Sequence, residues 1–100
     1  MDPLIGKVAI VTGASSGIGE AIVRALVLIG VHVIGVARNQ DKLRKVEESL
    51  VGARGSFYPY RCDLRNEEEI LNVFRYVDNK FGGIDILINN GGVAFVEPII

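Results

Sequence analysis

The 100-residue sequence has one cysteine, one histidine and no tryptophan. The lone cysteine, Cys62, cannot form an internal disulfide, and no cluster of metal-ligand residues surrounds it in the sequence. A disulfide-stapled scaffold and a zinc-binding module are therefore excluded, and we expect no metal site. Disulfides are rare in reducing compartments, so the cysteine content favours a cytoplasmic location.

The sequence also lacks an excess of charge of either sign, a signal peptide and a long apolar run. Eleven basic and 12 acidic residues give a net charge of −1, without the basic surplus of a nucleic-acid-binding domain. Residues 1–4 have neither the basic region nor the apolar core of a secretory signal. No run approaches the roughly 20 apolar residues of a membrane span. We expect one small globular domain that has no nucleic-acid partner and does not cross a membrane.

Short apolar segments alternate with helix-like segments along the whole chain. Buried strands are predicted at residues 7–11, 32–37, 56–62 and 84–89. Pro59 cannot donate a hydrogen bond to a neighbouring strand, so the third strand should lie at a sheet edge. Helices are predicted from Gly17 to the stop at Gly30, between Gln40 and the loop at 51–55, and from the cap at Asn66 to the stop at 82–83.

Apolar spacing within each helix predicts the face that packs on the sheet. Asn66 and Glu69 are expected to form a reciprocal capping pair at the start of the third helix. The residues that recur at helical spacing in the first, second and third helices are, in turn, Ile18, Ala21, Ile22, Ala25, Leu26 and Ile29; Leu43, Val46 and Leu50; and Ile70, Leu71, Phe74 and Val77.

The order βαβαβαβ with short connections predicts an α/β fold. Right-handed crossovers imply a Rossmann-like, doubly wound parallel sheet with strand order 3-2-1-4. Residues 1–100 are then a single dinucleotide-binding domain, truncated after the fourth strand and incomplete on its C-terminal side. The apolar segment 95–100, with no helix cap or polar tail, is what a cut end would look like.

Residues 12–19, Thr-Gly-Ala-Ser-Ser-Gly-Ile-Gly, join the first strand to the first helix. Backbone N–H groups and the partial positive charge of a helix N-terminus make such a turn an anion site. Gly13 permits the tight turn, Gly17 allows a diphosphate to approach the backbone, and Gly19 lets the helix pack close to the strand. The alternative is a tight turn that binds no ligand.

Four motifs in this order resemble those of the short-chain dehydrogenase/reductase family. They are the glycine turn at 12–19, Arg38 after the second strand, Cys62-Asp63-Leu64 after the third, and residues 89–92, Asn-Asn-Gly-Gly, after the fourth. The family usually has Asn-Asn-Ala-Gly, and the change at Gly91 removes only a methyl group. Within the family, the sequence looks most similar to the dehydrogenase/reductase member 11-like or farnesol-dehydrogenase-like branch.

The resemblance implies a set of cofactor-binding residues. A further residue, Thr12, would tie the turn to Asn89 and Asn90. Asp63 and Leu64 would contact adenine, although Asp63 could simply be a turn residue before the third helix. The implied cofactor-binding residues are Gly13, Ala14, Ser15, Ser16, Gly17, Ile18, Gly19, Arg38, Asn39, Asp63, Leu64, Asn90 and Gly92.

Arg38 decides the expected cofactor. Relatives that use NAD place an acidic residue at the end of the second strand to bind the ribose 2′-hydroxyl, whereas this chain has Ala37 and then Arg38. A guanidinium pairs with a 2′-phosphate, which a carboxylate would repel. We therefore expect NADP(H) in preference to NAD(H). The alternative is that Arg38 is an ordinary solvated side chain.

By resemblance, the activity is hydride transfer between nicotinamide and an alcohol or carbonyl substrate such as an isoprenoid alcohol, a steroid or a small carbonyl. The family's catalytic serine, tyrosine and lysine follow the asparagine motif, so no catalytic residue is assigned. Tyr76 and Lys80 match the Tyr-x-x-x-Lys spacing but precede that motif, and are expected to be an exposed helix pair.

Two hypotheses remain open for the chain. It is either the NADP(H)-binding half of an oxidoreductase or a non-catalytic nucleotide-binding or interaction module, complete as given. In both cases the fourth strand would leave an apolar edge bare, which favours self-association.

Overall fold

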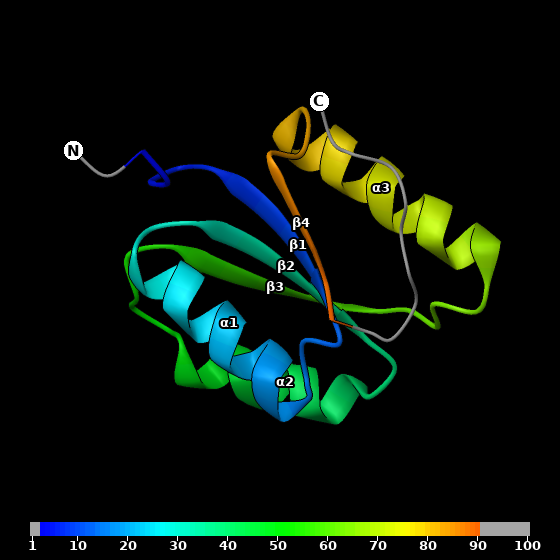
Figure 1. The fold of residues 1–100 in the computed structure, drawn as a ribbon, viewed down its shortest axis with the longest axis horizontal. Helices are drawn as coiled ribbons and strands as arrows, with labels where there is room; N and C mark the ends of the chain where they lie inside the picture. Colours follow the sequence, from blue (N-terminus) through cyan, green and yellow to red (C-terminus); the bar gives the residue numbers. More distant parts are fainter. Residues whose placement is uncertain (1–2, 91–100) are drawn as a thin grey trace.

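Strands and helices alternate through the computed structural model, which describes residues 3–90 (Figure 1). The apolar segment 95–100 lies outside this range. The second strand has its predicted bounds, and the other three differ from prediction by one or two residues at their ends. The elements are β1 (Val8–Thr12), α1 (Gly17–Leu28), β2 (His32–Ala37), α2 (Gln40–Ser49), β3 (Ser56–Arg61), α3 (Glu67–Phe81) and β4 (Ile86–Asn89).

The strands form one sheet in the order β3-β2-β1-β4, and every pair is parallel. This confirms the predicted α/β, doubly wound architecture. Pro59 lies in β3 at the sheet edge, as expected for a residue that cannot donate to a second neighbour. Parallel pairing brings the carboxyl ends of all four strands to one edge of the sheet.

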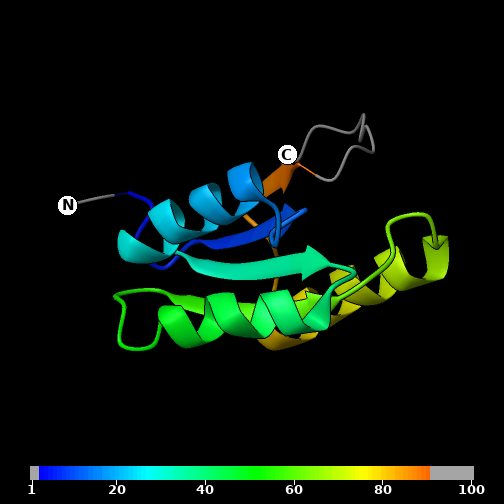
Figure 2. The same cartoon turned by 90° about the horizontal axis from the view of Figure 1, so that it is seen from below.

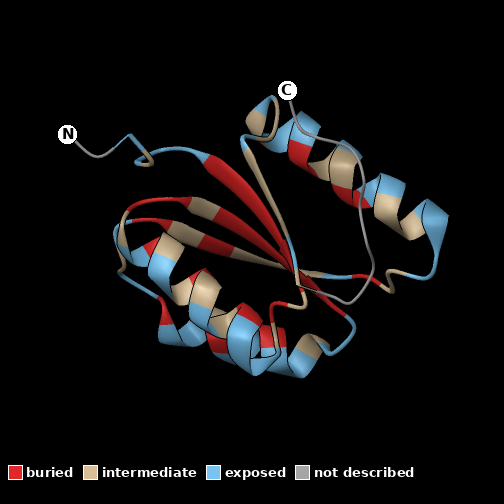
Figure 3. Cartoon of the chain, viewed as in Figure 1, coloured by how far each residue is buried: buried red, intermediate tan, exposed pale blue. Residues whose placement is uncertain are grey.

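Helices cover both faces of the sheet, α1 and α2 on one side and α3 on the other (Figures 1 and 2). Successive residues of β1 alternate between the two layers: Ala9 and Val11 pack under α1 and α2, and Val8 and Ile10 under α3. All five residues of β1 are buried, which explains its nearly uninterrupted apolar sequence (Figure 3).

The predicted inner face of α1 is wrong for three of its six residues. The buried residues are Gly19, Val23 and Val27, whereas Ile18 is 70% exposed and Ala21 and Ala25 are also exposed. The helix is rotated because Gly19 must lie against the β1 turn, and residues four and eight positions later then face the sheet. Ile22, Leu26 and Ile29 pack at the edge of this core.

The prediction for α2 is confirmed, because Leu43, Val46 and Leu50 are all buried. The prediction for α3 needs correction. Val73 and Val77 are its buried residues, Ile70 and Phe74 pack at the margin, and Leu71 is 47% exposed. Val73 and Val77, four positions apart, lie on the face of α3 that packs on the sheet. Leu71 is therefore turned towards solvent.

Strand β4 is less well covered than β1. Its three apolar residues, 86–88, are half-buried and Asn89 is exposed. Within residues 3–90 it pairs only with β1. This exposed edge is what motivates the expectation of self-association, which stays a prediction. No helix in the described residues is long and apolar enough to cross a membrane.

Candidate functional site

A cavity of about 390 Å³ opens where the carboxyl ends of β1, β2 and β3 meet. This edge of a doubly wound sheet is where ligands bind. Six of the predicted site residues line the cavity: Gly13, Ser15, Arg38, Asn39, Asp63 and Leu64. The remaining lining residues are Val36, Ala37, Cys62 and Arg65.

The turn after β1 is tight and hydrogen-bonded to its neighbours. Gly13 has a φ of 65°, a conformation that side chains disfavour. Its carbonyl accepts hydrogen bonds from the Ser16 amide at 3.1 Å and the Ser16 hydroxyl at 2.8 Å. Ala14 is fully buried and its amide donates to the Val36 carbonyl at 3.2 Å. Ala14 therefore belongs to the wall of the turn rather than to its open face.

The same turn is tied to the end of β4. The Thr12 hydroxyl donates to Asn89 Oδ1 at 2.8 Å and accepts from the Asn90 amide at 2.9 Å. The side-chain amide of Asn90 donates to Ser16 Oγ at 3.2 Å. The predicted link between Thr12 and residues 89–90 is thus confirmed. Gly92, the last predicted site residue, lies outside the described residues.

Two of the turn's glycines face different surroundings. A Cβ on Gly19 would overlap the Gly13 carbonyl oxygen and lie 2.8 Å from Asn90 Nδ2. A Cβ on Gly17 would meet nothing within 4 Å. Gly19 is therefore required by packing inside the chain, as predicted. The open space beside Gly17 is where a ligand could approach the backbone.

The amides at the start of α1 lack a side-chain acceptor. Ser16 occupies the N-cap position, but its side chain makes no capping hydrogen bond. By contrast, Asn39 Oδ1 accepts from the Lys42 amide at 3.1 Å to cap α2, and Asn66 Oδ1 accepts from the Glu69 amide at 3.2 Å to cap α3. The first turn of α1 thus presents N–H donors that an anion could use.

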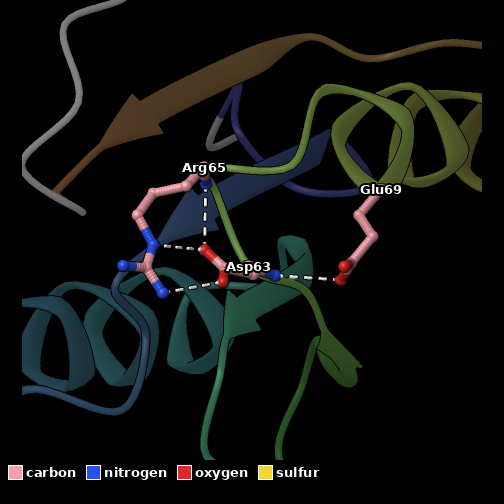
Figure 4. Close-up of polar contacts among 3 residues, drawn as sticks. All are labelled: Asp63, Arg65 and Glu69. Atoms are coloured by element: carbon pink, nitrogen blue, oxygen red, sulfur yellow. Dashed lines mark hydrogen bonds and ion pairs between the residues drawn. The ribbon is translucent and has the colours of Figure 1, made fainter.

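Asp63 is held from two sides at the end of β3 (Figure 4). Its Oδ1 accepts from the Arg65 amide at 2.9 Å and from Arg65 Nε at 3.2 Å, and its Oδ2 accepts from Arg65 Nη2 at 3.1 Å. Its own amide donates to Glu69 Oε1 at 3.0 Å. The predicted capping pair is therefore only half formed, because the Glu69 carboxylate reaches past Asn66 to Asp63.

Arg65 also lowers the pKa of the neighbouring Asp63 carboxyl group and so keeps it ionised. The hydrogen bonds from its side chain and amide lower the pKa of Asp63 from 3.8 to about 2, and the positive charge of Arg38 acts in the same direction. Two guanidinium groups and one carboxylate therefore stand together on the cavity wall. Asp63 also takes part in the turn before α3, since its carbonyl accepts from the Asn66 amide at 2.9 Å. Asp63 can therefore be a turn residue before α3 and a ligand-binding residue at the same time.

Four cavity residues were not predicted as site residues: Val36, Ala37, Cys62 and Arg65. Arg65 was missed, although an aspartate two residues before it is a signal for a local side-chain turn. Cys62 was expected to be a buried apolar residue, and it is 1% exposed. Burial raises the pKa of its thiol, and Glu69 and Asp63 raise it further, so the thiolate is disfavoured. Within residues 3–90 no cluster of His, Cys, Asp and Glu could hold a metal ion.

Tyr76 and Lys80 were expected to be an exposed helix pair, and only Lys80 is exposed. Tyr76 is half-buried, with its ring centroid 5.1 Å from that of Tyr60. Lys80 is exposed, with Nζ 5.1 Å from the centroid of the Tyr58 ring. Both side chains pack α3 against β3, and neither lines the cavity.

A family model for short chain dehydrogenases matches residues 7–100. The chain belongs to the short-chain dehydrogenase family. It is 48% identical to dehydrogenase/reductase SDR family member 11 from Gallus gallus over its whole length, which is 40% of that protein. It is 45% identical to farnesol dehydrogenase from Aedes aegypti, over 93% of this chain and 38% of that one. The chain thus spans about two fifths of these relatives.

Solved structures of the family share the fold described above. L-Sorbose reductase from Gluconobacter frateurii, complexed with NADPH and L-sorbose, superposes with a TM-score of 0.83 at 37% identity, over 96% of this chain and 37% of that one. A metagenomic short-chain oxidoreductase in complex with NADP superposes with a TM-score of 0.85 at 43% identity. The match covers 92% of this chain and 42% of that one. The family resemblance noted in the motifs is therefore confirmed over nearly the whole chain.

Proposed function

We propose that this short-chain dehydrogenase chain is the NADP(H)-binding part of an oxidoreductase that moves a hydride between nicotinamide and an alcohol or carbonyl. Residues 1–100 would serve as its dinucleotide-binding domain, in the cytoplasm. The cavity at the carboxyl ends of the strands carries the proposal, because it joins the glycine turn to Arg38 and Asp63. The NADP(H)-bound relatives support the choice of cofactor.

The diphosphate would bind at the start of α1. Side-chain caps are absent there, so the amides of Gly17, Ile18 and Gly19 offer donors to an anion, and the helix dipole adds positive potential. Ser15 lines the cavity beside this position. Ser16 and Asn90 hold the turn in shape through their 3.2 Å hydrogen bond. A rigid site loses little entropy when the ligand binds.

The adenosine ribose and its 2′-phosphate would lie beside Arg38. Strand β2 ends at Ala37, so no carboxylate stands where one would repel a phosphate. Arg38 is exposed and can offer two N–H donors to the phosphate oxygens. Asn39 lines the same cavity, although its side-chain oxygen is already used to cap α2. Arg65 is bonded to the Asp63 carboxylate, so the exposed guanidinium of Arg38 is the group that favours the cofactor with the extra phosphate.

Adenine would lie against Leu64, with its exocyclic amine directed to Asp63. Bound nicotinamide would supply the hydride acceptor or donor, and the residues described here would bind and orient the dinucleotide. The relative from Aedes aegypti is named for farnesol, so an isoprenoid alcohol is one proposed substrate, beside steroids and small carbonyls.

Titration of NADPH and NADH into the chain, followed by calorimetry, tests the proposal. We expect NADPH to bind at least about tenfold more tightly, because a charge-assisted hydrogen bond contributes roughly 1.5–3 kcal/mol. Arg38→Asp should remove or reverse this preference, whereas Arg38→Lys should keep part of it. Circular dichroism checks that each variant folds. Equal affinities for the two nucleotides in the unmodified chain would overturn the cofactor assignment.

A further inference from the structure

The contacts around Asp63 exceed what a turn residue needs. Three donors of Arg65 converge on its carboxylate, and Glu69 binds its amide from the opposite side (Figure 4). The two partners come from different places, the loop after β3 and the first turn of α3. Together they fix both the backbone and the χ angles of one side chain on the cavity wall.

The arrangement contributes little to stability by itself. The Arg65 side chain is 76% exposed and the Asp63 side chain 26% exposed. Ion pairs between solvent-exposed groups have small effects on the free energy of unfolding because water screens them. The more specific consequence is orientation, since a guanidinium with two bonds to one carboxylate sets the direction of both oxygens.

The hydrogen bonds from Arg65 also determine which oxygen of the Asp63 carboxylate can still accept a hydrogen bond. An ionised carboxylate has roughly four acceptor sites. Oδ1 receives two donors from Arg65 and Oδ2 receives one. The remaining capacity is therefore on Oδ2. Since Asp63 lines the cavity, a ligand donor that reaches this carboxylate would meet Oδ2.

We propose that Arg65 is a positioning residue for base recognition: it holds the Asp63 carboxylate so that Oδ2 accepts a hydrogen bond from the exocyclic amine of adenine. Arg65 then acts through Asp63 and makes no contact with the 2′-phosphate, which is left to Arg38. The inference rests on the proposed dinucleotide function and adds a determinant of base selectivity. It predicts that the site distinguishes a 6-amino purine from a 6-oxo purine.

The test compares NADPH with its hypoxanthine analogue, reduced nicotinamide hypoxanthine dinucleotide phosphate, in which an oxygen replaces the amine. The unmodified chain should prefer NADPH about tenfold, because the analogue's oxygen faces a carboxylate with no donor between them. In Asp63→Ala the preference should vanish, and in Arg65→Ala it should fall at least threefold. Arg65→Lys should restore part of it. The ratio of NADPH to NADH affinities should stay the same in Arg65→Ala.

The outcomes are distinguishable. If Arg65→Ala lowers the affinities for NADPH and for its hypoxanthine analogue by the same factor, Arg65 has only a structural role and the inference is wrong. If it lowers the NADPH to NADH ratio instead, Arg65 binds the phosphate, which also overturns the inference. Absence of a base preference in the unmodified chain refutes it while leaving the cofactor proposal intact. Failure of the unmodified chain to bind any of these dinucleotides refutes the proposed function itself.

Titration of the Asp63 carboxyl by nuclear magnetic resonance gives a readout independent of the nucleotide. The pKa of Asp63 should be about 2 in the unmodified chain and should rise towards 3.8 in Arg65→Ala. Arg38 remains beside Asp63 in the variant, so the rise should be incomplete. Because the folded-state pKa is depressed, the pair's stabilisation is complete above pH 3.8 and is lost as the pH falls through about 2. An unchanged pKa would contradict the contact.

Discussion

Helices α1 and α3 both begin at the carboxyl edge of the sheet, but their first turns differ. The N-terminus of α3 is capped by Asn66, and Glu67, Glu68 and Glu69 place negative charge near its dipole. The first turn of α1 has no side-chain cap, and Glu20 is its only acidic residue. The comparison suggests that α3 is optimised for its own stability, whereas α1 leaves its donors to an external anion.

The missing side-chain cap lowers the stability of α1, and other contacts at the start of this helix offset the loss. Thr12 binds Asn89 of β4 and the amide of Asn90, and the Asn90 side chain donates to Ser16 Oγ at the start of α1. The close approach of Gly19 to Gly13 holds the first turn of α1 against β1. These contacts stabilise the turn without covering the α1 amides. A site built from backbone groups is thereby kept rigid and open.

The largest expected effect concerns the packing of α1. Gly19→Ala should lower the free energy of unfolding by about 3 kcal/mol or more, because the added methyl overlaps the backbone of Gly13, which cannot move away as a flexible side chain could. Urea denaturation followed by circular dichroism measures the change. Gly17→Ala is the matched control, since its methyl meets open space and should not destabilise the fold. Similar stability of the two variants would refute the close approach.

A smaller pair of effects separates the two helix starts. Asn66→Ala should destabilise the chain by about 1 kcal/mol through loss of the α3 cap. Ser16→Asp should instead add an N-cap to α1 while it removes the hydroxyl's bond to the Gly13 carbonyl, so the free energy of unfolding should change by less than about 1 kcal/mol. The same substitution should weaken NADPH binding at least about tenfold, since the carboxylate repels the diphosphate and occupies its donors. If Ser16→Asp leaves the NADPH affinity unchanged, the α1 amides are not available as proposed.

Much of the fold could be predicted from the sequence because its signals are local. The glycine stops, the strand composition and Pro59 led to the correct strand order, and the order of the four motifs predicted the edge where the cavity lies. The rotation of α1 could not be predicted from apolar spacing alone. It depends on the contact of Gly19 with Gly13, which exists only after the strand and helix have packed.

The same limit applies to the environment of Asp63. Its place after β3 was predicted, and it does line the cavity. The bonds from Arg65 and to Glu69 depend on the conformation of the loop between β3 and α3. Sequence spacing instead favoured a pairing of Glu69 with Asn66, three residues before it. The local turn sets which amide the Glu69 carboxylate can reach.

The most direct test of the account is NADPH affinity in Gly17→Ala. This glycine lies at the uncapped start of α1, and a methyl there has no neighbour within 4 Å in the chain itself. We expect a folded protein, with a free energy of unfolding equal to or slightly above that of the unmodified chain. Its NADPH affinity should nevertheless fall at least about tenfold, because the methyl occupies the space of the diphosphate. Unchanged affinity in the folded variant would contradict the claim that the diphosphate binds at the start of α1.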